Sequence, residues 1–499
     1  MTFDHQQIES SDSISHDSAR ARPMFVLLSM SLSLLWLSLL SCVSVDSDAP
    51  PSDESVLILP DGKQDTGYYS NLAMELEGDF VSTITLEVTH LSETERDKLL
   101  DRTVLGLIAE KQVKMAKGQL NEKQLHLNLT AGDVTFIEKG IITRADGDFL
   151  MAQYSVVAES LVTLKELKEE GISPQDLENT THQVIVPEDP RDLFQRAGES
   201  CAEGFVPGDL KESNYFYYFT PEKPTCKLEM GANTTFTLRS LLPQRETFPE
   251  YDRLVEDGIL ETAVVFGAYT DDEPPQSDWG VMMHRSYAVH LKLSGWDRIE
   301  GLSVGQRYQR QRGELIQEID LFSPTDLYHL QDTNTAFAEL LKTKEVIVYN
   351  GHSFYGSLEA LDRASNYPEN RYQILFMNSC WSYEYYTKQV FVHKATEEDP
   401  SGWADVDVIN NTTYAYFPQI GASTNKFITN LLAGAVHLGA DDQGRRYSWQ
   451  NIIGIMNDEA SGVCPEDADP RDCRRYRPKN AHEVYGVSGV RDNRFTPSR

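Results

Sequence analysis

The second half of the chain alternates short apolar runs with segments whose apolar residues recur at helical spacing. Bounded apolar runs of this length are typical of strands buried on both faces of a parallel sheet. The segment 325–341, with Leu327, Leu330, Phe337 and Leu341, can form a helix that crosses a sheet face. The predicted strands are Thr262–Tyr269, Leu315–Leu321, Val346–Tyr349, Ile374–Met377 and Val406–Ile409. This alternation predicts an α/β domain over residues 258–499, with a parallel-dominated, doubly wound sheet flanked by helices.

Residues 67–181 have a different pattern, which predicts a smaller α+β domain before the sheet. Ser92 precedes Glu95 in a capping-box arrangement, so a helix should start there and run toward Met115. The expected strands are Phe80–Val88, Leu125–Leu129, Val134–Ile142 and Phe149–Val157. No residue pattern in this domain indicates chemistry, and structural support, binding and an inhibitory role all stay open. Residues 182–257 are expected to form an irregular connector.

The amino end reads as a secretory signal. Arg20 and Arg22 precede an apolar run over residues 24–40, which is short for a transmembrane span, the alternative. The run ends in LLSC, which resembles a bacterial lipobox, so the signal would comprise residues 1–42 and Cys42 would be lipidated. Residues 43–66, rich in Ser, Asp and Pro, would tether the fold to a membrane. The resemblance implies a lipid-anchored protein of the bacterial cell envelope, and Val43 after the cysteine favours the outer membrane.

The chain is strongly acidic, with 77 Asp and Glu against 45 Lys and Arg and a net charge of −32. This charge argues against nucleic acid and anionic surfaces as partners, whereas cationic substrates or calcium are allowed. Zinc-protease, paired CxxC, serine-hydrolase and phosphate-loop motifs are absent from the sequence. No metal site or cofactor is therefore predicted, and the oligomeric state stays open.

Cysteine parity gives an independent indication of chemistry. Six cysteines less the lipidated Cys42 leave five in an oxidising compartment, and an odd number leaves one free thiol. Several pairings are possible, but the nearest neighbours are Cys201 with Cys226 and Cys464 with Cys473. Those pairings would leave Cys380 as the free thiol.

Two predicted strands end in reactive side chains. The first is followed by Asn350, Gly351 and His352, and the second by Ser379 and Cys380. Carboxyl ends of adjacent parallel strands meet at one edge of a sheet, where ligands bind. A thiol and an imidazole there can act as a nucleophile and its proton partner, although a loop histidine and a buried cysteine can also be purely structural.

The segments YNGHS and FMNSC resemble the histidine and cysteine segments of the caspase-like (clan CD) cysteine peptidases, especially the gingipains. The resemblance spans about Thr262–Ala440 and implies an endopeptidase that acts on peptide or protein substrates. Cys380 would be the nucleophile with a lowered pKa, His352 the proton donor, and the backbone N–H groups of Ser353 and Cys380 the oxyanion hole. The family usually has Gly where this chain has Ser353.

Members of that family select the residue before the cleaved bond, usually Arg, Lys, Asp or Asn. Three acidic residues are candidates for pairing with a basic substrate side chain: Glu384, Asp405 and Asp407. Two alternatives stay open. One is a catalytically inactive, caspase-like surface lipoprotein that acts as a binding or scaffold protein. The other is a different thiol hydrolase or acyltransferase.

Overall fold

The computed structural model describes residues 67–497, apart from short internal stretches and the longer stretch 461–482. The predicted signal and tether, Cys42, Cys464 and Cys473 lie outside the described residues. Their predicted lipidation and disulfide therefore stay predictions.

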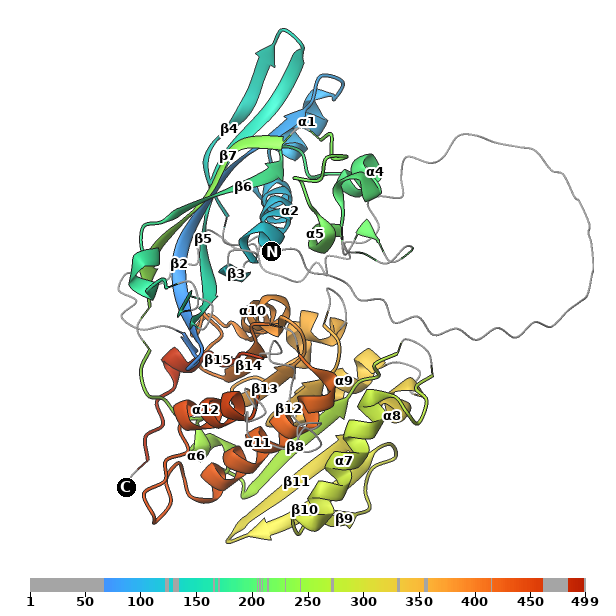
Figure 1. Ribbon diagram of the computed structural model, residues 1–499, viewed down its shortest axis with the longest axis vertical. Coiled ribbons are helices and arrows are strands. Elements are labelled where there is room, and N and C mark those ends of the chain that lie inside the picture. Colours follow the sequence, from blue (N-terminus) through green and yellow to red (C-terminus); the bar gives the residue numbers. More distant parts are fainter. Residues whose placement is uncertain are drawn as a thin grey trace, which may run out of the picture. The chain divides into compact units, whose positions relative to one another are not determined.

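The described residues form an α/β structure with two sheets, as the sequence predicted (Figure 1). The larger one, sheet A, has the order β1-β15-β14-β13-β12-β8-β11-β10-β9. Its strands are β1 (Tyr68–Tyr69), β8 (Ile259–Phe266), β9 (Asp297–Ile299), β10 (Gln306–Arg312), β11 (Leu315–Phe322), β12 (Val346–Asn350), β13 (Gln373–Asn378), β14 (Val406–Asn411) and β15 (Tyr485–Ser488). The central five, β14-β13-β12-β8-β11, are parallel, and antiparallel strands flank them on both sides. All five predicted strands are present, and they form this parallel centre.

Helices connect the parallel strands, and Figure 1 shows α7 and α11 crossing one face of sheet A. The helices of this part are α6 (Tyr251–Leu254), α7 (Trp279–Leu293), α8 (Pro324–Tyr328), α9 (Thr333–Thr343), α10 (Lys388–Lys394), α11 (Phe417–Val436), α12 (Trp449–Ala460), the π-helix η7 (Tyr383–Thr387) and the 3-10 turns η5 (Glu359–Asp362), η6 (Ala364–Asn366) and η9 (Val490–Asp492). The helix predicted over 325–341 is divided into α8 and α9. Apolar residues of β8, β12 and β13 pack with those of α7, α11 and α12 in one fully buried cluster.

Sheet B is antiparallel, with the order β3-β5-β2-β7-β6 and β4 paired to β5. Its strands are β2 (Ala73–Glu87), β3 (Leu125–Asn128), β4 (Val134–Arg144), β5 (Gly147–Thr163), β6 (Thr181–Pro187) and β7 (Met230–Leu241). The helices and turns before residue 220 are α1 (Glu93–Leu99), α2 (Arg102–Asn121), η2 (Pro174–Leu177), α4 (Leu193–Ala197), η3 (Gly198–Cys201) and α5 (Tyr215–Tyr218). Ser92 caps α1 with the predicted capping box.

The boundary predicted at residue 181, between the α+β domain and the connector, is wrong. The segment expected to be an irregular connector supplies β6 and β7, and β7 pairs with the long β2 in sheet B. The predicted disulfide between Cys201 and Cys226 is present in this segment. Tyr68 and Tyr69 belong instead to sheet A, where they pair with β15. These pairings join residues far apart in sequence, so a local apolar pattern does not reveal them.

His284 on α7 provides a test of the packing around sheet A. Its side chain is buried against Phe266, and its Nε2 has no hydrogen-bond partner among the residues that the structure describes. Burial lowers the pKa of His284 to about 4. The charge of Asp326 opposes this shift and that of Arg285 adds to it. The imidazole is therefore neutral in the folded protein at pH values where the unfolded chain, with a pKa of about 6.5, already binds a proton.

Because the unfolded state binds this proton first, the free energy of unfolding should fall as the pH drops from about 6.5 to about 4, by up to about 1.4 kcal/mol per pH unit from this group. Denaturant unfolding of wild type and His284→Leu across this range measures the contribution. The variant should lose this part of the pH dependence. Parallel pH profiles for the two proteins would contradict the assignment.

Candidate active site

The structure brings His352 and Cys380 to the same edge of sheet A. Strands β12 and β13 pair in parallel with Asn350 opposite Asn378, and each reactive residue follows its strand end by two positions. The side-chain hydroxyl of Ser353 donates a hydrogen bond to the backbone carbonyl of Cys380, which ties the two loops together. The predicted juxtaposition of the two loops is therefore present, at the carboxyl edge of the parallel strands.

A buried polar network fixes the two strand ends beneath these loops. The Asn378 amide Nδ2 donates to Asn350 Oδ1 at 2.8 Å, and Thr424 Oγ1 of α11 donates to the same oxygen at 2.8 Å. The Tyr485 hydroxyl lies 3.1 Å from Asn378 Oδ1 and 2.6 Å from Glu483 Oε2, so its single proton is shared between these two acceptors. All five residues are buried. Since breaking a buried hydrogen bond leaves an unsatisfied group, this network resists displacement of either strand end.

His352 is oriented by a backbone carbonyl. Its Nε2 lies 3.1 Å from the carbonyl oxygen of Tyr269, in the loop after β8, so Nε2 carries the proton and donates it. The imidazole also contacts the rings of Phe417, with centroids 4.8 Å apart, and Tyr269, at 5.7 Å. Asp278 holds the loop in place, because its Oδ2 accepts from the backbone N–H groups of Tyr269 and Thr270. This arrangement leaves Nδ1 as an acceptor for a proton.

Cys380 is a free, partly exposed thiol. The backbone N–H of Ala415 donates to its Sγ at 3.3 Å. Burial raises the pKa of Cys380 above the ordinary value, the Ala415 N–H opposes this, and the charge of Glu483 raises it further. The expectation of a lowered pKa is therefore wrong for this structure, because burial of the thiol outweighs the Ala415 N–H and the Glu483 carboxylate acts in the same direction as burial. At neutral pH the thiol is protonated until a base takes its proton.

The thiol is surrounded by backbone groups. Among the described residues no hydrogen bond joins His352 to Cys380, and the Cys380 N–H interacts with its own thiol, which opposes the rise in its pKa. Ser353 does not adopt a positive φ, so its backbone conformation does not require glycine. Trp381, directly after the cysteine, does adopt a left-handed conformation with φ of 44°. Strained backbone of this kind is frequent at functional sites.

The three acidic residues proposed for substrate selection have different positions. Asp405 and Asp407 lie at the amino end of β14, whereas Cys380 follows the carboxyl end of β13, to which β14 is parallel. Asp405 forms an ion pair with Arg253 at 2.7 Å, and Asp407 is fully buried. Both predictions are therefore wrong on geometric grounds. Glu384 lies in η7, just after Cys380, and is 8% exposed.

Several residues around the dyad escape sequence reasoning. His352 is contacted by Tyr269 and by Phe417 at the start of α11. Cys380 is contacted by Ala415, and the charge of Glu483 raises its pKa. All four residues are far from His352 and Cys380 in sequence. Glu483 is buried, with Oε1 accepting from the Tyr416 N–H at 2.5 Å and Oε2 from the Tyr485 hydroxyl at 2.6 Å. None of these residues belongs to a recognisable motif, so the sequence offers no signal for them.

Comparisons with known proteins add no identification. Scans of family models, curated proteins and solved structures find no match to the chain. In the described part of the chain, no group of three or more His, Cys, Asp or Glu side chains is placed to hold a metal ion. Within the same residues, no helix combines the length and apolar character needed to cross a bilayer.

Proposed function

We propose that the protein is a cysteine endopeptidase of the caspase-like type, with Cys380 as nucleophile and His352 as its proton partner. The observation that carries the proposal is the position of both residues at one edge of sheet A, two positions beyond paired strand ends. The orientation of His352 by the Tyr269 carbonyl supports it, since a catalytic base is usually held by a third group.

The reaction would proceed through a covalent acyl-enzyme. Cys380 Sγ attacks the scissile carbonyl carbon while its proton passes to Nδ1 of His352, and the carbonyl oxygen becomes an oxyanion. The backbone N–H groups of Ser353 and Cys380 would be the donors that stabilise that charge. His352 then gives the proton to the leaving amine, and water hydrolyses the thioester to release the acid and regenerate the thiol.

The substrate would be a peptide with a basic residue before the cleaved bond. The support is the acidity of the chain, with its net charge of −32. Glu384 is the predicted acidic residue that remains close to Cys380 in sequence and lies at the correct end of β13.

We include anchoring through a lipid on Cys42, in the bacterial cell envelope, in the same proposal. Its support is the LLSC sequence.

A second candidate is a non-catalytic binding protein that uses the same edge of the sheet. The specific observation in its favour is the raised pKa of Cys380, together with the lack of a hydrogen bond between the thiol and His352. Such a protein would bind a peptide without cleaving it. Unligated peptidases can also have loose catalytic contacts that tighten on substrate binding, so geometry alone does not exclude catalysis.

Covalent labelling separates these candidates. A peptide acyloxymethyl ketone with a basic residue beside its reactive group should label wild type at Cys380 and should not label His352→Ala. Iodoacetamide, which needs no catalytic assistance, serves as the matched control and should alkylate Cys380 in both proteins. Cys380→Ala should react with neither reagent. Equal labelling of wild type and His352→Ala by the ketone would support the binding protein.

Anchoring has its own test. Growth in labelled palmitate should label the wild-type protein and leave Cys42→Ala unlabelled and unprocessed, since the acyl chain requires that thiol. Cys380→Ala provides the control, because it removes a different cysteine and should be labelled normally. Persistent lipid incorporation in Cys42→Ala would refute the anchoring proposal.

A further inference from the structure

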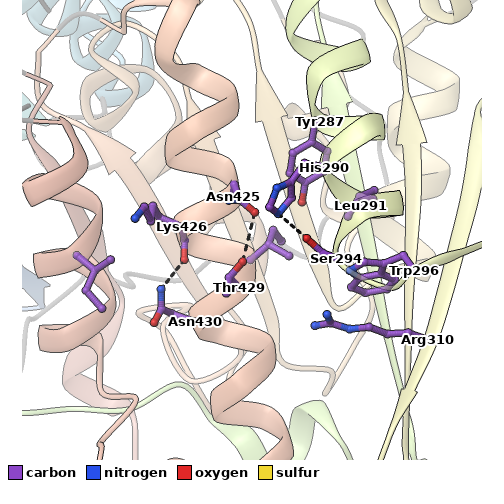
Figure 2. Close-up of a pocket in the computed structure, with 12 residues that line it drawn as sticks. Tyr287, His290, Leu291, Ser294, Trp296, Arg310, Asn425, Lys426, Thr429 and Asn430 are labelled. Atoms are coloured by element: carbon purple, nitrogen blue, oxygen red, sulfur yellow. Dashed lines mark hydrogen bonds between the residues drawn. The ribbon is translucent and has the colours of Figure 1, made fainter. Parts of the chain in front are cut away.

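A pocket separate from the His352–Cys380 edge lies between α7, α11, α12 and β10. Its volume is about 440 Å³. Its lining consists of Tyr287, His290, Leu291, Ser294, Trp296, Arg310, Asn425, Lys426, Ile428, Thr429, Asn430 and Ile455. Figure 2 shows Arg310 and Trp296 on one wall and the side chains of α11 opposite them. A volume of this size matches a small organic ligand.

The charge of this pocket is opposite to that of the chain. None of its twelve lining residues is acidic, although Asp and Glu make up 77 of the 499 residues of the protein. Lys426 pairs with Glu459 at 3.2 Å, outside the lining set. Burial lowers the pKa of His290, so this imidazole is neutral at neutral pH. The remaining charge in the pocket belongs to Arg310.

Arg310 is held in place but has no carboxylate partner among the described residues. Its Nε donates to Gln317 Oε1 at 2.7 Å, and its guanidinium lies 4.2 Å from the centre of the Trp296 ring. Burial, with a smaller contribution from the charge of Arg312, lowers the pKa of Arg310 to about 10, and Tyr287 opposes this shift. The two Nη groups, which form the fork that carboxylates bind, remain available. Arg310 is partly buried, and a partly desolvated cation without an anion is stabilised when an anion binds beside it.

Tyr287 gives independent support for a ligand in this pocket. Its side chain lines the same pocket and is 3% exposed, yet within the described part of the chain its hydroxyl has no hydrogen-bond partner. A buried hydroxyl is nearly always paired, so an unpaired one beside a cavity suggests that a ligand atom pairs with it. Leu291, Ile428 and Ile455 form apolar surface between the polar groups.

We propose that this pocket binds an organic carboxylate with an apolar or aromatic body. The carboxylate pairs with the Nη groups of Arg310, the body packs against Trp296 and the apolar residues, and a second polar atom bonds to the Tyr287 hydroxyl. The same chemistry is found in a free organic acid and in the carboxyl terminus of a peptide. The proposal is independent of the activity at Cys380.

The test uses the full chain and 3-(4-hydroxyphenyl)propanoate as the probe. Titration should change the fluorescence of Trp296 and saturate below about 1 mM, and the neutral amide of the probe should bind at least about tenfold more weakly. Arg310→Gln should weaken probe binding at least about tenfold, and Arg310→Lys should weaken it too because lysine lacks the planar fork. Arg312→Gln carries the same change in charge outside the pocket and should bind normally.

Further binding measurements test the role of Tyr287 and distinguish a free acid from a peptide terminus as the ligand. Tyr287→Phe keeps the ring and should weaken binding about threefold to tenfold. A peptide with a free carboxyl-terminal Tyr is compared with its amidated form and with the probe. If this peptide binds more tightly than both, the pocket is assigned to peptide termini. If the probe binds more tightly, the pocket is assigned to free acids. Equal affinity for probe and amide would overturn the proposal. So would equal losses in Arg310→Gln and Arg312→Gln, or no saturation by either carboxylate up to about 10 mM.

Discussion

Replacing Cys380 by alanine is expected to reduce peptide cleavage at least about a thousandfold, with nearly the same loss in His352→Ala and in the double variant. In the proposed mechanism the two residues act as one unit: without the imidazole the protonated thiol is a poor nucleophile, and without the thiol the imidazole has nothing to activate. Turnover of the best substrate from a positional peptide library measures these losses. Circular dichroism should show that all three variants fold, since neither side chain belongs to the buried core.

The control for this experiment is His90→Ala, which removes an exposed histidine from the loop before α1 and should leave turnover unchanged. Additive losses, with the double variant much slower than either single variant, would show that the residues act independently. If wild type cleaves no member of the library, with or without calcium or prior nicking by another protease, the binding-protein alternative replaces the peptidase proposal.

The variant Asp320→Asn should lower the free energy of unfolding by about 3 kcal/mol. Asp320 is 1% exposed and pairs with two cations, Arg307 at 2.6 Å and Lys344 at 2.8 Å. Burial opposes ionisation of this carboxyl, but hydrogen bonds from both cations outweigh it and lower its pKa. The stabilisation is therefore present at neutral pH and lost as the pH falls below the ordinary aspartate range. Amidation removes the anion that the two cations share, and leaves Lys344 with Glu261 at 2.9 Å and Arg307 with Glu318 at 3.6 Å.

Asp79→Asn is the matched control. Asp79 pairs with Arg239, whose side chain is 50% exposed, so its loss should cost under about 1 kcal/mol. Urea unfolding of the two variants beside wild type gives the comparison. Equal stability of Asp320→Asn and wild type would contradict the buried network.

The sequence determined the parallel centre of sheet A and the edge at which His352 and Cys380 meet. Strands such as Val346–Asn350 and Gln373–Asn378 are buried on both faces, so they appear as continuous apolar runs, and a parallel sheet aligns their carboxyl ends. The capping box at Ser92 was also readable, because its hydrogen bonds join residues three apart. Cysteine spacing indicated the pairing of Cys201 with Cys226 and the free thiol of Cys380.

The tertiary structure decided what surrounds those residues. The carbonyl of Tyr269, the ring of Phe417 at the start of α11 and the charge of Glu483 reach His352 or Cys380 from three distant segments, and no local pattern marks them. Asp405 and Asp407 lie at the opposite edge of the sheet from Cys380, because β14 is parallel to β13 and both residues are at its amino end. The raised pKa of Cys380 depends on burial and through-space charge, which are properties of the packed structure and not of the residue order.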